Sequence, residues 1–261
     1  MTDPSRHTAS EMLAILSARQ LKEGQVVFAG IGVPLLAATL AQRLRCPGLT
    51  ILFEGGVIGA FVEPGKLPPS TNDQRCTKRA NMVLGSAEVL LLLQRGYVDI
   101  GFMGGAQIDK YGNLNSSFIG DSDNPKTRLP GTGGGNDISS LTNMIVAMKH
   151  EKRRFVDHVD FITSPGFIRG GNSRAASGLP EGGMFRVITE LAVFSFDDTS
   201  RLMKVLALNP GITREQVQDN TGFDLIFDDQ LSVTEPPTEH ELTTLRMLDP
   251  CLLYTSPSPR D

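Results

Sequence analysis

The sequence predicts an α/β fold in which helices flank a mainly parallel sheet. Short runs of β-branched and apolar residues alternate with segments of helical period along most of the 261 residues, without an internal repeat. The 27 glycines and 16 prolines are concentrated between the strand-like runs, where loops are expected. We therefore expect residues 1–250 to form a single domain.

Composition and charge exclude several classes of protein. With 40% hydrophobic and 21% charged residues, the chain can bury a sizeable core, and disorder is not expected. A formal net charge of -4 provides no general attraction to nucleic acid or to an anionic membrane. Because no apolar segment is long enough to span a bilayer and the N-terminus lacks the apolar core of a signal peptide, we expect a cytoplasmic protein. The cysteines have no CxxC spacing and no histidine at ligand spacing, so neither a disulfide nor a metal site is predicted.

Capping patterns and apolar periodicity indicate where the helices lie. Thr8 and Glu11 form a capping box at the start of an opening helix, which we expect to end near Gly24. The other predicted helices combine an apolar period with a capping or closing residue, and they cover residues 35–44, 86–95, 213–218 and 238–248.

Apolar runs bounded by glycine or polar residues predict the strands, at residues 25–29, 50–53, 98–103, 144–148, near 185–196 and at 202–208. Residues 104–117 contain two short extended runs around a polar turn, which predicts an inserted β-hairpin. Residues 55–80 have no periodicity, which is typical of a lid or interface loop or of a plain surface loop.

A single carboxylate stands where a buried strand ends. The strand at residues 50–53 is followed by Glu54, and then Gly55 and Gly56 release the backbone from its usual φ/ψ limits. Ligands of open α/β sheets bind outside the carboxyl ends of the strands, so Glu54 is a candidate catalytic group. The alternative is a solvated turn residue.

Gly30 and Gly32 lie in a second candidate site, between a strand and a helix whose first turn contains Pro34. Unpaired N–H groups at a helix N-terminus favour a carboxylate or a phosphate, so these glycines are predicted to contact substrate. The third glycine of the dinucleotide fingerprint is missing, and a tight turn without a ligand is the alternative.

The most glycine-dense loop, with the sequence GTGGGND, contains Gly133, Gly134 and Gly135. Its successive backbone N–H groups suit an oxyanion or a thioester carbonyl, and it lacks the Lys-Ser/Thr of a Walker loop. Gln107 provides an amide at another strand end, and we predict that it acts with these glycines in binding an oxyanion or CoA.

The charge run at residues 149–154 (KHEKRR) is either a solvated face or a phosphate contact. His150, His158 and His240 have no evident partners and are expected to be structural. Residues 251–261 (CLLYTSPSPRD) have no apolar period, and we expect this tail to be non-native, a translated adapter, so it is excluded from the fold.

Several long phrases resemble the β subunits of class I CoA-transferases of the glutaconate type. The phrases are GGAQIDKYGNLNSS, IGDSDNPKTRLPGTGGGND, MKHEKRRF and VDFITSPGF, and the likeness extends from about Ser10 to Pro250. The resemblance implies an α/β sheet shared with ribose-phosphate isomerases, and an active site formed only with a similarly folded α subunit. Acyl-CoA and a carboxylic acid would be the substrates, with no permanently bound cofactor.

The resemblance also implies that Glu54 is the covalent nucleophile, which would form a glutamyl-CoA thioester. The family's usual context is Glu-Ser-Gly or Glu-Asn-Gly, whereas Gly55 follows Glu54 here. A glutaconate-like dicarboxylate is the favoured acid. The alternatives are an acyl-CoA hydrolase or decarboxylase of the same fold, related lineages of which lack the glutamate, and a non-catalytic metabolite-sensing subunit.

Overall fold

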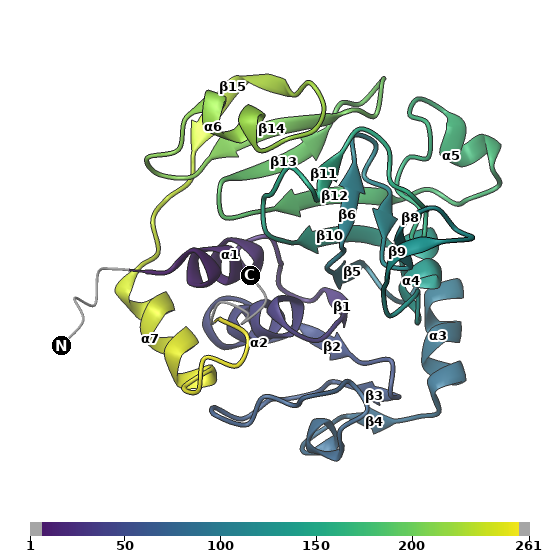
Figure 1. The fold of residues 1–261 in the computed structure, drawn as a ribbon. Helices are drawn as coiled ribbons and strands as arrows, with labels where there is room; N and C mark the ends of the chain where they lie inside the picture. The colour runs from purple at the N-terminus through teal and green to yellow at the C-terminus, as the bar shows by residue number, and fades with distance from the viewer. Residues whose placement is uncertain (1–6, 256–261) are drawn as a thin grey trace. The chain divides into compact units, whose positions relative to one another are not determined.

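The computed structural model describes residues 7–255 and confirms the predicted α/β class. The chain divides into two compact units, one formed by Met1–Met103 and Pro236–Asp261, the other by Gly104–Glu235. Figure 1 shows the helices and strands along the chain. Within the described residues, no helix has the length and apolar character needed to cross a membrane.

The first unit contains a sheet in which β1 is parallel to both of its neighbours. The strands follow one another across this part of the sheet in the order β5 (Ile100–Met103), β1 (Val26–Ala29), β2 (Thr50–Leu52), β3 (Val57–Ile58) and β4 (Met82–Val83). Val27 lies opposite Ile51 on one side and Ile100 on the other. Strands β1, β2 and β5 are apolar at successive positions because a parallel strand is normally buried on both faces.

The β2–β3 and β3–β4 pairs are antiparallel, and β4 is the last strand in this direction. Both β4 side chains are exposed, Met82 by 51% and Val83 by 57%. Thus the predicted long loop at residues 55–80 contains more regular structure than its lack of periodicity indicated: β3 near its start and the 3₁₀ helix η1 (Gln74–Thr77) near its end.

The helices of the first unit are α1 (Ala9–Ala18), α2 (Val33–Leu44), α3 (Ser86–Gln94) and α7 (Glu239–Leu248). Helices α1, α2 and α7 pack against one another, and α2 packs on β1. Figure 1 shows α1, from the start of the chain, beside α7, from its end. Two ion pairs connect these two helices: Arg19 Nη2 lies 2.7 Å from Glu241 Oε2, and Arg246 Nε lies 2.7 Å from Glu11 Oε1.

The capping box of α1 is confirmed, but the expected helix end near Gly24 is wrong, because α1 ends at Ala18. The N–H groups of Gln20 and Leu21 bond to carbonyls three residues back, which tightens the chain out of the α-helix. Leu21 is thereby buried, and Gly24, with a φ of 76°, forms the turn into β1.

The second unit contains five strands in the order β15 (Ile226–Val233), β14 (Met203–Leu208), β13 (Ala192–Phe196), β12 (Gly183–Ile188) and β10 (Asn143–Ala147). The β14–β15 and β10–β12 pairs are parallel, and the β13–β14 and β12–β13 pairs are antiparallel. The edge strand β15 was not predicted, because its acidic and mostly exposed sequence lacks the apolar alternation of a buried strand.

The predicted hairpin is confirmed in the second unit. Strands β6 (Gln107–Asp109) and β7 (Leu114–Asn115) are antiparallel, and β11 (Phe155–Val156) adds to β6 in parallel. A further hairpin and three short helices complete this unit, namely β8 (Phe118–Gly120) with β9 (Pro125–Arg128), α4 (Gly135–Leu141), α5 (Ser173–Ala176) and α6 (Arg214–Asp219).

His150 lies in the core of the second unit. Its ring stacks on Phe155 with centroids 4.0 Å apart, and its two nitrogens lie 3.2 and 3.0 Å from the hydroxyls of Thr189 and Thr221. Burial lowers the pKa of His150 to about 3, so the ring is neutral at physiological pH. This environment agrees with a structural role.

Part of the tail at residues 251–261 follows α7 in the structure. The Asp249 carboxylate accepts hydrogen bonds from the backbone N–H groups of Leu253, Tyr254 and Thr255. Residues 256–261 lie outside the described residues. The non-native origin of the tail stays a prediction.

Replacing Glu11 should make the first unit less stable and less sensitive to acid. Burial opposes ionisation of Glu11, but hydrogen bonds from Arg246 and from the Thr8 N–H outweigh it and hold the Glu11 pKa below its ordinary 4.5. A carboxylate with a depressed pKa stabilises the fold above the unfolded pKa, and this contribution is lost as the pH falls through the folded value. We expect Glu11→Gln to lower the free energy of unfolding by about 1–3 kcal/mol at pH 7.

Urea unfolding of both proteins across a pH series checks this expectation. The difference between wild type and variant should shrink once the pH falls below about 4.5. Glu239→Gln makes the same chemical change at an exposed position of α7 and serves as the control. A difference that persists unchanged at low pH would contradict the assignment to the ion pair.

Candidate active site

Glu54 lies in the tight turn that joins β2 to β3. The Gly56 N–H donates to the Phe53 carbonyl at 3.0 Å, and the Phe53 N–H donates to the Val57 carbonyl at 2.9 Å. Residues 54–56 thus form a short hairpin loop, and its last residue, Gly56, has a φ of 102°. A Cβ on Gly56 would collide with the Leu84 carbonyl oxygen, so the loop requires glycine there for both reasons.

The Glu54 side chain is half-buried in this turn. Within residues 7–255, neither of its carboxylate oxygens makes a hydrogen bond or an ion pair. A structural carboxylate in a turn normally caps nearby N–H groups, as Asp109 does for Tyr111 and Asn113. Glu54 is therefore positioned by its backbone while its functional group stays available to a ligand.

Gly55 is packed closely beneath a neighbouring segment. A Cβ on Gly55 would lie 2.6 Å from the Thr71 carbonyl oxygen and 2.9 Å from the Asn72 Cα, distances that real side chains do not reach. The segment Ser70–Asp73 is itself closed by a hydrogen bond from the Asp73 N–H to the Ser70 carbonyl. The absence of a side chain at position 55 therefore allows this part of the long loop to lie against the Glu54 turn.

The turn at Gly30 and Gly32 lies at the same sheet edge as Glu54. Phe28 is opposite Leu52 in the parallel β1–β2 pair, so both chain segments leave the sheet there in the same direction. The Gly30 N–H donates to the Phe102 carbonyl at 2.9 Å and extends the β1–β5 ladder. Gly32, with a φ of 90° and open space at its Cβ position, is the N-cap of α2 and leaves the helix start without a side-chain cap.

The glycine-rich loop of the second unit offers two unpaired backbone donors. Gly135 donates its N–H to the Thr132 carbonyl at 2.8 Å, and the Thr132 hydroxyl accepts from the Asn136 N–H. Among the described residues, no acceptor bonds to the N–H of Gly133 or of Gly134, although Gly134 is buried. A buried N–H without a partner is rare, so Gly134 is a candidate donor to an oxyanion, and the exposed Gly133 beside it can add a second N–H.

Gln107 is held in a buried network within the same unit. Its side-chain oxygen accepts hydrogen bonds from Asn115 Nδ2 at 2.7 Å and from the Asp160 N–H at 3.2 Å. Its amide nitrogen donates to Asp160 Oδ2 at 3.2 Å, which leaves one N–H for a further acceptor. The hairpin that carries Gln107 is also tied to the glycine loop, because Ser116 and Gly131 exchange hydrogen bonds.

The predicted residues thus form two groups. Glu54, Gly30 and Gly32 share one sheet edge in the first unit. Gln107 belongs to the second unit, together with the glycine loop at residues 133–135.

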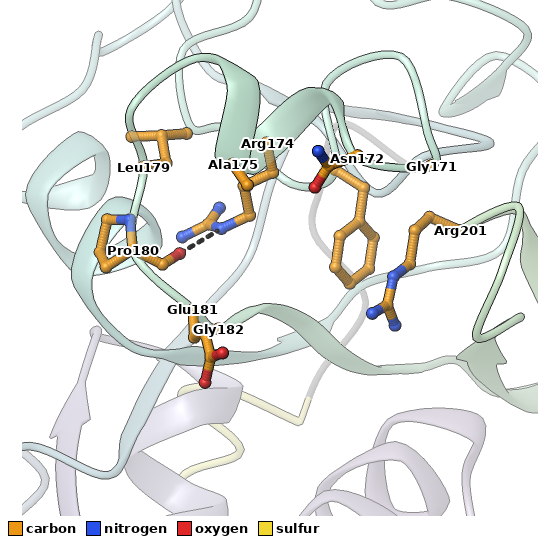
Figure 2. A pocket seen from close by; sticks show the side chains of 10 residues that line it. Gly171, Asn172, Arg174, Ala175, Leu179, Pro180, Glu181, Gly182 and Arg201 are labelled. Carbon is orange, nitrogen blue, oxygen red and sulfur yellow. Dashed lines mark hydrogen bonds between the residues drawn. The ribbon is translucent and has the colours of Figure 1, made fainter.

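A residue that the sequence did not single out, Arg174, organises the loops of the second unit. Its side chain borders a cavity of about 470 Å³ and lies on α5 (Figure 2). All five guanidinium N–H groups donate to backbone carbonyls, those of Ser139, Ser140, Pro165, Gly166 and Pro180. Figure 2 shows the bond to Pro180.

Arg174 also fixes the helix that follows the glycine-rich loop. Two of its acceptors, the carbonyls of Ser139 and Ser140, lie in the last turn of α4, where a cation is favourable. Helix α4 begins at Gly135, so Arg174 holds the far end of the helix that the glycine loop enters. Burial lowers the pKa of Arg174, but a guanidinium remains charged at neutral pH.

Comparisons with known proteins decide the family. The model of the coenzyme A transferase family matches residues 10–220. The B subunit of the 3-oxoadipate CoA-transferase from Pseudomonas knackmussii is 41% identical over 247 residues, 94% of each chain. The B subunit of the glutaconate CoA-transferase from Acidaminococcus fermentans is 38% identical over 242 residues, 90% of each chain. This chain belongs to the coenzyme A transferase family.

The fold agrees with this assignment. The crystal structure of glutaconate coenzyme A-transferase from Acidaminococcus fermentans matches with a TM-score of 0.91 at 36% identity, over 98% of this chain and 100% of the other. The resemblance predicted from the sequence phrases is therefore confirmed at the level of the family. Gly55, which stands where we noted serine or asparagine as the usual residue of the family, has a close backbone neighbour in this coenzyme A transferase.

A side chain at position 55 should displace the segment above the Glu54 turn. We expect Gly55→Ser to lower the free energy of unfolding by about 1–3 kcal/mol, because the Thr71–Asn72 backbone must move to admit the new atoms. Hydrogen exchange should become faster at residues 70–73. Gly104→Ser is the matched control, since its nearest neighbour, the Ala147 carbonyl, lies at an ordinary 3.4 Å. Equal exchange in both variants would contradict close packing at Gly55.

Replacing Arg174 by lysine, which has fewer N–H donors, should make α4 less stable. A lysine has three N–H donors in place of five, so Arg174→Lys leaves buried carbonyls unpaired, and we expect a loss of about 1–3 kcal/mol. Amide exchange measured by mass spectrometry should accelerate in Gly135–Leu141. Arg169→Lys, at an exposed position of the neighbouring loop, is the control. Unchanged protection of α4 in Arg174→Lys would refute the role assigned to this side chain.

Proposed function

We propose that this chain is the B-type subunit of a CoA-transferase that moves CoA from an acyl-CoA to a carboxylic acid, with Glu54 as the covalent nucleophile. The observation that carries the proposal is the Glu54 carboxylate. It is half-buried in a backbone-defined turn and free of hydrogen bonds to any of residues 7–255, in a chain of the coenzyme A transferase family. Such a carboxylate has the freedom that a nucleophile needs.

The reaction conserves the energy of the thioester in two exchanges. A Glu54 oxygen attacks the acyl carbonyl carbon, and the C–S bond breaks, which gives a mixed anhydride and the CoA thiolate. The thiolate then attacks the glutamyl carbonyl carbon and releases the first acid as its carboxylate. The resulting glutamyl-CoA thioester reacts with the second acid by the same steps in reverse, so the kinetics are ping-pong.

Each step passes through a tetrahedral oxyanion that needs preorganised donors. The unpaired N–H groups of Gly133 and Gly134 support this role, and loss of one such donor typically costs about 10²–10³ in rate. Gln107 would add the side-chain N–H that does not donate to Asp160. Gly135 would act by shaping the loop, because its own N–H is bonded to Thr132.

Substrate contact by the Gly30–Gly32 turn would come from Gly32, since the Gly30 N–H belongs to the sheet. The start of α2 beyond Gly32 has no side-chain cap, so its N–H groups could face the carboxylate of an acid. The names of the similar proteins include glutaconate and 3-oxoadipate, which are both dicarboxylates. We therefore propose a short dicarboxylic acid as one substrate.

A partner subunit would complete the site. The similar proteins are named as B subunits, and an anhydride or glutamyl thioester must be kept from water to avoid hydrolysis. We propose that an α subunit supplies this cover together with the segment that packs on Gly55. The complex would work in the cytoplasm.

Glu54→Gln should abolish CoA exchange, because the amide cannot form the anhydride or release a carboxylate. We expect a fall of at least about 10³ in kcat for the co-expressed complex, measured with acyl-CoA and a dicarboxylate acceptor. Mass spectrometry of wild type incubated with acyl-CoA alone should find CoA on the peptide that contains Glu54. Glu215→Gln, an exposed change on α6, is the control and should keep full activity.

Other outcomes would identify the other candidates. Exchange at the wild-type rate in Glu54→Gln would remove this carboxylate from the mechanism. Turnover of acyl-CoA to free acid or to a decarboxylated product, without a Glu54 adduct, would favour a hydrolase or a decarboxylase. Binding of acyl-CoA without any turnover would favour a sensing subunit.

A further inference from the structure

A second cavity in the unit formed by residues 104–235 combines apolar walls with basic side chains. It encloses about 420 Å³, and the apolar part of its lining comes from Ala106, Ile119 and Leu129. Lys126, Arg153 and Arg154 also line it. The two arginines come from the KHEKRR run, for which the sequence left open either a solvated face or a phosphate contact.

The side chains that line this cavity include three basic groups and no acidic group. Arg153 Nε lies 2.6 Å from Glu151 Oε2, and Arg154 Nε lies 3.1 Å from the same oxygen, but Glu151 does not line the cavity. Lys126 adds a third positive charge and makes no ion pair with any of residues 7–255. An anion with several charges would therefore find net positive charge here.

The nearby acidic residues do not cancel this charge inside the cavity. Asp121 and Asp123 lie in the exposed turn between β8 and β9, and neither lines the cavity. Asp160 is also close, because its carboxylate accepts hydrogen bonds from the Gly120 N–H and the Gln107 amide, but it does not line the cavity either. The Arg153 guanidinium and then the Arg154 guanidinium hold the pKa of Glu151 below its ordinary value, so Glu151 is ionised and already shared. Partly exposed ion pairs of this kind are weak, and a phosphate can compete for the same guanidinium groups.

The walls of the cavity are fixed by backbone pairing. The Ile108 N–H donates to the Arg154 carbonyl at 2.7 Å, where β11 joins β6. Ile119 is opposite Thr127 in the β8–β9 hairpin. The site is therefore largely preformed, and little conformational entropy would be lost when a ligand binds.

The chain leads from the wall of this cavity directly into the glycine-rich loop. The Leu129 N–H donates to the Ser117 carbonyl at 3.0 Å, and Gly131, two residues further on, donates to the Ser116 carbonyl at 2.8 Å. Gly133, with its unpaired N–H, is only four residues beyond Leu129, a span of at most about 14 Å. A ligand with phosphates at one end, a flexible arm, and a thioester at the other end could reach both places.

We propose that this cavity binds the phosphorylated adenosine end of the CoA thioester, with Lys126, Arg153 and Arg154 facing its phosphates. Ala106, Ile119 and Leu129 then contact the apolar face of the nucleoside. The identity of the ligand rests on the proposed function, whereas the affinity of the site for a nucleotide bisphosphate can be measured separately. The flexible arm leads from here toward the N–H groups of Gly133 and Gly134.

Lys126→Gln and Arg128→Gln form the test pair. Both remove one positive charge from the exposed strand β9, but only Lys126 lines the cavity. With the complex and its partner subunit, we expect Lys126→Gln to raise the KM for the acyl-CoA about three- to tenfold, the range for loss of one partly exposed charge-assisted contact. The kcat and the KM for the acceptor acid should stay unchanged, and Arg128→Gln should behave like wild type.

Calorimetry with adenosine 3′,5′-bisphosphate separates this inference from the proposed function. If the complex proves inactive but binds the bisphosphate, and Lys126→Gln weakens that binding while Arg128→Gln does not, the site stands and the transferase proposal fails. If transfer occurs but both variants raise the KM equally, or neither does, the site is refuted while the transferase proposal stands. No detectable binding of the bisphosphate to an active complex would also overturn the site.

Discussion

The turn that presents Glu54 depends on the close approach of one carbonyl oxygen. The Leu84 carbonyl occupies the space where a side chain at position 56 would be, and the Leu84 N–H in turn donates to the Gly56 carbonyl. This contact continues the antiparallel pairing in which Val57 is opposite Val83. Because Gly56 can adopt a positive φ, the chain reverses within three residues and β3 returns beside β2.

The two units position their candidate groups by different physical means. In the first, strand register and one glycine turn are sufficient, and the carboxylate itself takes no part in holding the turn. In the second, side chains bond to the backbone of loops: Asn113 accepts from the N–H groups of Gly166 and Ile168, and Arg174 bonds to five carbonyls. In loops fixed in this way, glycine N–H groups are not all used by a regular ladder and stay available to a ligand.

Local signals in the sequence were sufficient for most elements. The capping boxes at Thr8, Thr213 and Thr238 are formed as their spacing indicates, because each depends on contacts within four residues. The hairpin at residues 104–117 and the strand before Glu54 were predictable for the same reason. The end of α1 was not, since it is set by burial of Leu21 and by local tightening that no capping pattern records.

Contacts between distant parts of the chain could not be predicted from local sequence patterns. That Gly55 lies under Thr71 could not be inferred from two glycines in a row, and Arg174 has no motif that separates it from an exposed arginine. The glycine-rich loop was recognised as a donor of N–H groups, yet which groups stay unpaired depends on the Thr132 carbonyl and hydroxyl. The long sequence phrases were enough to identify the family, because many of their residues are fixed by contacts with distant parts of the chain.

The exposed strand β4 affects how this chain behaves outside a cell. An edge strand with unpaired backbone groups and apolar side chains such as Met82 and Val83 is a template on which another strand can add. Natural edges are usually protected by short length, by charge, by proline or by a covering element, and β4, although only two residues long, has neither a charged side chain nor a proline. Purified alone at high concentration, the chain would therefore tend to associate with itself, so its solubility depends on whatever shields that edge.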